Sequence, residues 1–312
     1  MAQRTKKKLD IEGIVPIIPV PFRENEAIDV SSLRNVVDFV ARRQMAGMCL
    51  PAYGSEFYKL SEDERIRVVE IAIETNAGRI PLMAQANHPN AKHAAALAKR
   101  FVRMGADIIN FAIPRQFGVT DKDLLQYCGQ ICDAVSTPVL IQDFNPGGPT
   151  IDASFITALH RRHKNFRYVK LEEPLIIDKV ARIRDAAGDR VGILEGWGGY
   201  YMLEAIPMGM VGVMPGVPYC ELLDMIYWAR KNGDDSRAYD LFGAVSPMMN
   251  FTLQNFELFL QIEKRLLVKR GIFKTHHVRS LTYTPSRHVL RYADYLIKQM
   301  LRVIKREGID LN

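Results

Sequence analysis

The sequence is poor in cysteine, with only Cys49, Cys128, Cys132 and Cys220 among 312 residues. Cys128 and Cys132 lie four residues apart in a helical pattern, and no second Cys/His pair has the spacing of a zinc ligand set. A disulfide framework and a structural zinc site are therefore not expected. We interpret all four as reduced thiols of a cytoplasmic protein.

Long apolar runs are also missing. No stretch of about 18 apolar residues is present, so no membrane-spanning helix and no membrane association are expected. The first ten residues, MAQRTKKKLD, are basic, but no apolar segment follows them as it would in a secretory signal. We expect residues 1–10 to form a short, flexible basic arm.

The formal net charge of +7 raises the question of a nucleic-acid partner. The positive charge is concentrated in residues 1–8 and in residues 261–312, where twelve Lys and Arg accompany four Asp and Glu. The sequence has no basic segment interleaved with aromatic residues, as would be expected of a groove whose aromatic side chains stack on the bases of a single strand. The charge is typical of a solvated surface or a subunit contact, and no nucleic-acid partner is expected.

Short apolar runs alternate with helical patterns along most of the chain. The expected strands are 14–20, 47–51, 79–85, 106–113, 137–144, 167–172, 191–196 and 211–216. The expected helices are 31–44, one opening at Ser61, 90–104, 121–134, 152–162, 175–187, 199–207 and 218–231. The strands are continuous apolar runs, as in a parallel sheet that is covered on both faces.

Eight strand–helix units within residues 11–232 predict an α/β fold, a (β/α)8 TIM barrel. An open doubly wound sheet is the alternative, but no glycine-rich dinucleotide fingerprint follows the first strand. Further helical patterns at 234–246, 250–270 and 286–306 predict a C-terminal helical extension over residues 233–312. No Ser/Gly-rich linker separates this extension from the barrel.

Several helix starts carry capping residues. Ser31 or Ser32 is expected to cap the first helix. Thr120 is expected to cap the helix at 121–134. Ser61 and Glu64 have the spacing of a capping box.

Lys170 is the strongest candidate for chemistry, because it lies where the apolar run of FRYVKLEEPL ends. Active sites of (β/α)8 barrels lie at the carboxyl ends of the strands. A buried amine there is biased towards its neutral form and can condense with a ketone to give a Schiff base. The alternative is a strand-end lysine that reaches solvent or pairs with Glu172 or Glu173.

Two other strand ends carry polar groups. In Ala52–Glu56, the amides of Gly54 and Ser55 and the Ser55 hydroxyl could hold a carboxylate, or the segment could be a plain loop. Gln142 and Asp143 could recognise a substrate hydroxyl or a water molecule, or they could bond to a neighbouring loop.

Other polar or soft residues are less informative. His276 and His277 are adjacent and lack the spacing that places two ligands on one helical face, so no metal site is expected. Met208, Met210 and Met214 are interpreted mainly as core residues.

The order GIVPIIPVPF, AYGSEFYKLSEDER, RIPLMAQ, YVKLEEP and GMVGVMPG resembles the dihydrodipicolinate synthase/N-acetylneuraminate lyase family of class I aldolases. The resemblance extends from about residue 11 to beyond residue 280. It implies a (β/α)8 barrel with a C-terminal helical domain, usually in a homotetramer. It also implies that Lys170 forms a Schiff base with pyruvate or another 2-oxo acid.

The chain departs from the family pattern at the second strand. The usual Gly-Thr-Thr-Gly-Glu signature reads Ala52–Tyr53–Gly54–Ser55–Glu56 here, so only Glu56 is retained. The resemblance then implies that the amides of Gly54 and Ser55, with the Ser55 hydroxyl, hold the substrate carboxylate.

Other expected residues are replaced. The tyrosine that relays protons in the family falls at Gln142, and a second, interfacial tyrosine falls at Arg115 or Gln116. The arginine that dihydrodipicolinate synthases use for the aldehyde substrate is missing from the Gly147–Gly148 region. VLIQDF, VKLEEP and EGWGG instead resemble a branch that includes 2-keto-3-deoxy sugar-acid dehydratases.

The expected function is therefore that of a Schiff-base lyase, a dehydratase or an aldolase, acting on a 2-oxo acid such as pyruvate or a 2-keto-3-deoxy sugar acid. Lys170 and Gln142 are the expected catalytic residues. The expected substrate-binding residues are Tyr53, Gly54, Ser55, Glu56, Gly196 and Met214. No metal or organic cofactor is needed, and a homo-oligomer, tetramer or dimer, is expected. The alternatives are a 4-hydroxy-tetrahydrodipicolinate synthase and a non-catalytic paralogue that binds a 2-oxo acid.

Overall fold

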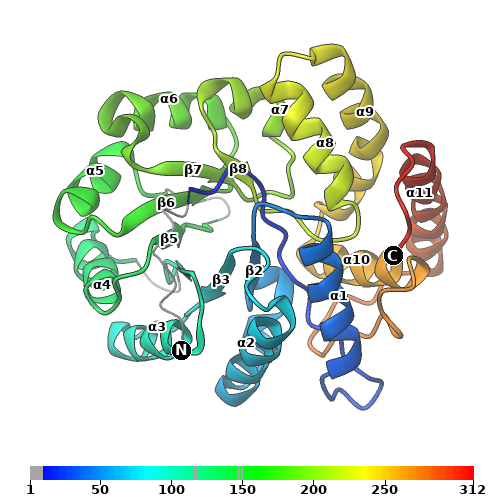
Figure 1. Ribbon diagram of the computed structural model, residues 1–312, viewed down its shortest axis with the longest axis horizontal. Coiled ribbons are helices and arrows are strands. Elements are labelled where there is room, and N and C mark those ends of the chain that lie inside the picture. Colours follow the sequence, from blue (N-terminus) through cyan, green and yellow to red (C-terminus); the bar gives the residue numbers. More distant parts are fainter. Residues whose placement is uncertain (1–9, 116–117, 146–147, 149) are drawn as a thin grey trace.

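The computed structural model describes residues 10–115, 118–145, 148 and 150–312 (Figure 1). Eight parallel strands form one sheet in the order β1-β8-β7-β6-β5-β4-β3-β2. Ile17, three residues past β1, forms isolated bridges to Cys49 of β2 and to Gly216, three residues past β8, and these bridges close the sheet. The predicted (β/α)8 barrel is confirmed. The predicted basic arm, except for Asp10, lies outside the described residues.

The strands are short, and helices connect them. The strands are β1 (Gly13–Ile14), β2 (Met48–Leu50), β3 (Leu82–Gln85), β4 (Ile108–Ala112), β5 (Val139–Gln142), β6 (Phe166–Leu171), β7 (Gly192–Glu195) and β8 (Gly212–Val213). The barrel helices are α1 (Val30–Arg42), α2 (Glu62–Asn76), α3 (Ala91–Met104), α4 (Asp121–Asp133), α5 (Ala153–Arg162), α6 (Ile176–Ala187), α7 (Met202–Ala205) and α8 (Cys220–Lys231).

Three further helices follow the barrel and gather on one side of it: α9 (Asp235–Thr252), α10 (Phe256–Lys269) and α11 (Arg287–Arg306) (Figure 1). Short 3-10 helices η1 (Tyr53–Ser55) and η2 (Phe57–Lys59) form the loop after β2. Two more, η3 (Gly188–Arg190) and η4 (Ile206–Met208), follow α6 and α7.

Helix capping agrees with the sequence at two of three positions. The Ser61 capping box and the Thr120 cap are confirmed. The prediction of Ser31 or Ser32 as the cap of α1 was wrong. Asp29 is the cap, because its carboxylate accepts hydrogen bonds from the amides of both serines at 3.2 and 3.3 Å.

Several predicted boundaries differ from the structure, and two of these differences have a clear physical cause. The first strand is shorter than 14–20, since Pro16 has no N–H to donate to a ladder. The break expected between 246 and 250 is absent. Helix α9 continues through Pro247 to Thr252 because its buried residues pack against the rest of the core, and Asn255 then caps α10.

The barrel interior has an apolar layer and, above it, a polar layer. Strands β3 to β6 contribute Met83, Ile108, Leu140 and Tyr168 to the apolar layer. Two residues further along the same strands stand Gln85, Asn110, Gln142 and Lys170, all buried. Because side chains alternate along a strand, these four also point inward, at the carboxyl ends of the strands. The fold therefore collects polar groups at the catalytic rim, over a closed apolar floor.

All four cysteines are buried and unpaired. No helix in the described part of the chain is long and apolar enough to cross a membrane.

Arg270, at the end of α10, ties the C-terminal helices to the barrel. Its guanidinium donates to both carboxylate oxygens of Glu221 on α8, at 2.8 and 3.0 Å. It also donates to the carbonyls of Pro218 and Leu311, at 2.6 and 2.7 Å. The side chain is fully buried, so its five donors have no alternative partner in water.

We therefore predict that Arg270→Met lowers the free energy of unfolding by about 3–5 kcal/mol, because it removes the bidentate partner of the buried Glu221 carboxylate, which keeps only Arg43 at 3.3 Å. Arg302→Met is the control, since Arg302 is an exposed residue of α11 and its loss should cost under about 0.5 kcal/mol. Urea denaturation followed by circular dichroism measures both. Equal midpoints for the two variants would contradict this role of Arg270.

Candidate active site

Lys170 lies near the carboxyl end of β6, at the rim of the barrel. On β6 it stands in register with Gln142 of β5 and Leu194 of β7. Its side chain is 5% exposed, and its Nζ lies 2.9 Å from Oε1 of Glu172. The ion pair that the sequence left open is thus formed with Glu172. Glu173 pairs instead with Lys179, at 3.2 Å.

The sequence indicated Glu172 only as a possible ion-pair partner of Lys170, but in the structure it is a central polar residue of the pocket. It stands two residues after Lys170, and its side chain is 6% exposed. Both of its carboxylate oxygens also lie within 3.1 Å of the Gln142 amide nitrogen. An ammonium group and an amide thus converge as hydrogen-bond donors on one buried carboxylate. The alternation of side chains along a strand was the signal that could have identified Glu172.

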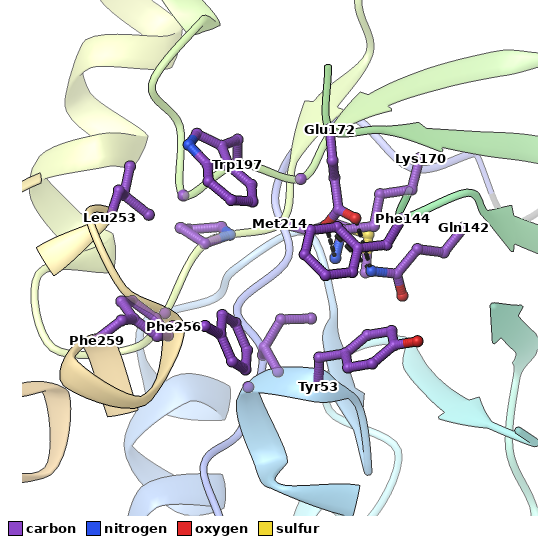
Figure 2. Close-up of a pocket in the computed structure, with 16 residues that line it drawn as sticks. Tyr53, Gln142, Phe144, Lys170, Glu172, Trp197, Met214, Leu253, Phe256 and Phe259 are labelled. Atoms are coloured by element: carbon purple, nitrogen blue, oxygen red, sulfur yellow. Dashed lines mark hydrogen bonds and ion pairs between the residues drawn. The ribbon is translucent and has the colours of Figure 1, made fainter. Parts of the chain in front are cut away.

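A pocket of about 510 Å³, its open mouth included, lies over this cluster. Lys170, Glu172 and Gln142 form its polar side (Figure 2). Its other walls are mainly apolar, from the loops after β5 and β7 and from the C-terminal helices: Phe144, Trp197, Leu253, Phe256 and Phe259. Charged chemistry is therefore confined to one side of a largely aromatic pocket.

The structure brings most of the predicted site residues together. Those that line the pocket are Tyr53, Gly54, Gln142, Lys170, Gly196 and Met214. Ser55 is not among them. Its hydroxyl donates to the Ile18 carbonyl at 2.6 Å and accepts from the Ala52 amide at 3.0 Å. Ser55 therefore caps its own turn. Its hydroxyl is not placed to contact a substrate carboxylate in the pocket, contrary to the expectation from the sequence.

Glu56 is also absent from the pocket lining, contrary to expectation. Its carboxylate is fully buried and forms ion pairs with Lys264 of α10 and, at 3.2 Å, with Lys59. Burial lowers the pKa of Lys264, and the charge of Glu56 opposes that shift. Glu56 adopts a left-handed conformation, with φ 59°. It therefore braces the turn that carries Tyr53 instead of meeting a ligand.

Tyr53 stands across the pocket from Lys170 (Figure 2). Its ring packs against Phe144 at 5.4 Å between centroids. Burial raises the pKa of the Tyr53 hydroxyl, and the negative charges of Glu172 and Asp143 raise it further. The phenol thus keeps its proton at neutral pH and can serve as a hydrogen-bond donor to a ligand.

Glu195 holds the loop after β7. Its carboxyl group accepts hydrogen bonds from the amides of Trp197 at 2.9 Å and Gly199 at 2.7 Å. Complete burial raises the pKa of Glu195 to about 8, although the two amide donors oppose the rise. A carboxyl group that is largely neutral at pH 7 adds little negative charge beside Glu172. Glu195 positions the Trp197 wall of the pocket.

Among the described residues, no cluster of three or more His, Cys, Asp or Glu side chains is arranged to hold a metal ion. The polar groups of the pocket are an amine, a carboxylate, an amide and a phenol. Together these can form a covalent imine and move protons beside it.

Comparisons with known proteins agree with this geometry. The model of the dihydrodipicolinate synthetase family matches residues 10–294. The chain belongs to this family.

Members of the dihydrodipicolinate synthetase family are lyases, and this chain is an enzyme of that class. It is 25% identical over 272 residues to L-2-keto-3-deoxyarabonate dehydratase of Azospirillum brasilense, covering 86% of this chain and 87% of that one. It is 30% identical over 179 residues to 4-hydroxy-tetrahydrodipicolinate synthase of Agrobacterium fabrum, covering 57% and 60%.

The solved 4-hydroxy-tetrahydrodipicolinate synthase of Methylacidiphilum fumariolicum superposes with a TM-score of 0.88 at 19% identity, covering 95% of this chain and 98% of that one. This likeness supports the fold. Two of the expected departures from the family lie in described parts of the chain. Gln142 occupies the pocket, and Arg115 donates to both carboxylate oxygens of Asp143 at 2.8 and 2.5 Å. Gln116 and Gly147 lie outside the described residues.

Gly196 offers a direct test of the site geometry. A Cβ at this position would lie 2.5 Å from Oε1 of Glu172 and closer still to Cε of Lys170. We predict that Gly196→Ala displaces both side chains and slows imine formation by about 100-fold, since ångström misplacements cost that much. The measurement is borohydride trapping of pyruvate, followed by intact mass.

Gly243→Ala is the matched control. Gly243 lies exposed in α9, where an added Cβ meets nothing within 4 Å. This variant should keep wild-type trapping and gain about 0.5–1 kcal/mol of stability. Undiminished trapping in Gly196→Ala would show that the Lys170–Glu172 arrangement is not needed for the covalent step.

Proposed function

We propose that this protein is a Schiff-base-forming lyase acting on a 2-oxo acid, with Lys170 as the nucleophile. The observation that carries the proposal is the buried amine of Lys170, 2.9 Å from the Glu172 carboxylate at the base of the pocket. The amine attacks the C2 carbonyl carbon. Glu172 first accepts a proton from the ammonium group, and a second proton passes from the nitrogen to the carbonyl oxygen as the C–N bond forms. Glu172 then returns its proton to the carbinolamine hydroxyl, which leaves as water.

The resulting iminium acidifies the hydrogens on C3. In the second step, Glu172 accepts a proton from C3, and the electron pair of that C–H bond forms an enamine. In the third, the enamine expels a hydroxyl group from C4, which takes a proton from Glu172 and leaves as water. Water then attacks the iminium carbon, its two protons pass to the nitrogen as the C2 carbonyl forms again and the C–N bond breaks, and Lys170 returns to its ammonium form. Each proton that Glu172 accepts is returned, so the enzyme ends unchanged.

A 2-keto-3-deoxy sugar acid is the proposed substrate class. The similarity to the Azospirillum brasilense dehydratase over 86% of the chain supports it. Such a substrate carries the C3 hydrogens and the C4 hydroxyl that this sequence of steps uses. Gln142 would hold a substrate hydroxyl or a water molecule where other family members have a tyrosine. Tyr53 would donate a hydrogen bond, and the backbone at Gly54 would approach the C1 carboxylate.

Two alternatives have specific support. The Agrobacterium fabrum relative, at 30% identity, favours 4-hydroxy-tetrahydrodipicolinate synthase activity. The presence of Gln142 at the position of the relay tyrosine argues against it. The same replacement would suit a non-catalytic protein that binds a 2-oxo acid. The paired Lys170 and Glu172 favour an enzyme. In line with the family resemblance, we further propose a cytoplasmic homo-oligomer, either a tetramer or a dimer.

The first test traps the covalent intermediate. We expect borohydride to fix one substrate-derived adduct on the wild-type chain after incubation with pyruvate or 2-keto-3-deoxyarabonate. Lys170→Ala should give no adduct. Lys179→Ala, which removes another buried lysine, should keep it, because Lys179 pairs with Glu173 and does not line the pocket. An adduct that survives Lys170→Ala would exclude Lys170 as the nucleophile.

The second test separates imine formation from proton transfer. We expect Glu172→Gln to lower kcat for dehydration by about 10²–10⁴-fold, the usual contribution of a general acid–base group. Trapping of pyruvate at long incubation should persist, since the amide is nearly isosteric with the carboxylate. Release of the dehydrated 2-oxo acid, followed by liquid chromatography, measures the rate. Wild-type turnover in Glu172→Gln would assign the proton transfers to another group.

A further inference from the structure

The amide of Gln142 is held from behind by a second buried amide. Gln85, at the end of β3, donates from its Nε2 to Oε1 of Gln142 at 3.0 Å. The same nitrogen donates to Oδ1 of Asn87 at 3.3 Å. That oxygen also accepts the backbone N–H of Ala112, at 2.7 Å. Gln85, Asn87 and Gln142 are all buried, so water does not compete strongly for these contacts.

The direction of this chain of amides is set at both of its ends. The backbone N–H of Ala112 can only donate, so the atom of Asn87 that faces it must be the oxygen. An oxygen there requires the nitrogen of Gln85 to face it. At the other end, the Glu172 carboxylate requires the nitrogen of Gln142, which turns the Gln142 oxygen towards Gln85. Reversing either glutamine would place two oxygens in contact.

We propose that Gln85 is a positioning residue that directs proton exchange by Glu172 towards Lys170 and the substrate. The proposal rests on the acid–base role of Glu172 described above. With Gln85 in place, Gln142 presents only N–H groups to Glu172. A protonated Glu172 therefore finds no acceptor on that side, and its proton must leave towards the pocket.

Without Gln85, the Gln142 amide is free to rotate. Its carbonyl oxygen could then accept a hydrogen bond from a protonated Glu172. The neutral carboxyl would be stabilised in an orientation that points its proton away from the substrate. The carboxyl group would take up its proton at a higher pH and return it to the substrate more slowly.

Other charged and titratable groups also act on Glu172. Lys170 on β6 pairs with it, Tyr53 of η1 and Glu195 of β7 lie within electrostatic range, and Asp143 acts on Tyr53 from beyond β5. All four remain in a variant that changes only Gln85. A shift in the protonation of Glu172 in that variant is therefore assignable to the chain of amides.

The test compares Gln85→Leu with Asn110→Leu. Asn110 stands beside Gln85 in register on β4, in the same buried polar layer, and its amide contacts Cys49 instead of Gln142. For Gln85→Leu we expect kcat to fall roughly tenfold, a part of the usual acid–base contribution, with little change in KM. The acidic limb of its kcat profile should move to higher pH. Asn110→Leu should retain the wild-type profile.

A second readout does not depend on turnover. Infrared difference spectra against pH follow the carboxyl C=O stretch of Glu172, assigned as the band that Glu172→Gln removes. In Gln85→Leu this band should appear at higher pH than in the wild type. Gln85→Met should shift the band in the same direction, because its side chain also lacks the N–H that holds the Gln142 oxygen and adds no charge. Thermal unfolding checks that each variant is folded, and Gln85→Met replaces Gln85→Leu if Gln85→Leu does not fold.

The outcomes separate the two proposals. If wild-type protein forms no imine and turns over no 2-oxo acid, the proposed function fails, while the infrared titration still tests Gln85. If the wild type is active but folded Gln85 variants keep both its pH profile and its carboxyl band, the positioning role is wrong. Equal shifts in Gln85→Leu and Asn110→Leu would also overturn it, since they would reflect loss of polarity in the layer as a whole.

Discussion

The ion pair between Lys170 and Glu172 is the interaction on which the rest of the site depends. Burying an amine beside a carboxylate costs desolvation energy, and this cost is offset only when both charges find good partners. Here the Glu172 carboxylate accepts hydrogen bonds from the Lys170 ammonium group and from the Gln142 amide. The side chains of Lys170 and Glu172 are almost fully buried. Transfer of the shared proton from Lys170 to Glu172 gives a neutral amine and a neutral acid together. These are the forms that attack a carbonyl and protonate a leaving hydroxyl.

The barrel creates this pair through strand geometry. Lys170 and Glu172 point the same way because they are two residues apart, and the polar layer stands on an apolar floor that closes the interior. Loops after β5 and β7 and the C-terminal helices then supply an aromatic wall around it. The wall limits access of water, which strengthens electrostatic interactions within the pocket. The C-terminal extension is therefore part of the site as well as of the fold.

The features of the fold and the site that could be predicted are those that depend on short, local sequence patterns. Eight apolar runs with helices between them predict the barrel, and a lysine at the end of one such run marks Lys170. Glu172 was within reach of the same reasoning. The roles of Ser55 and Glu56 were not, because the partner of Glu56 is Lys264, 208 residues away in the sequence. Phe256 and Phe259 carry no local signal either, since only tertiary packing brings α10 to the pocket.

Gln142 stands where the family resemblance implies a proton-relaying tyrosine, and this difference changes how protons can move. A phenol can give and take a proton, whereas a carboxamide can only orient one. An enzyme with glutamine at this position must place its acid–base group elsewhere, and the Glu172 carboxylate lies within hydrogen-bond distance of the Gln142 nitrogen. Gln142 then acts by holding Glu172 beside Lys170, and the amides behind it keep its nitrogen in that direction. A glutamine at this position thus favours an enzyme whose proton transfers depend on one carboxylate, two residues after Lys170 and one residue past the end of β6.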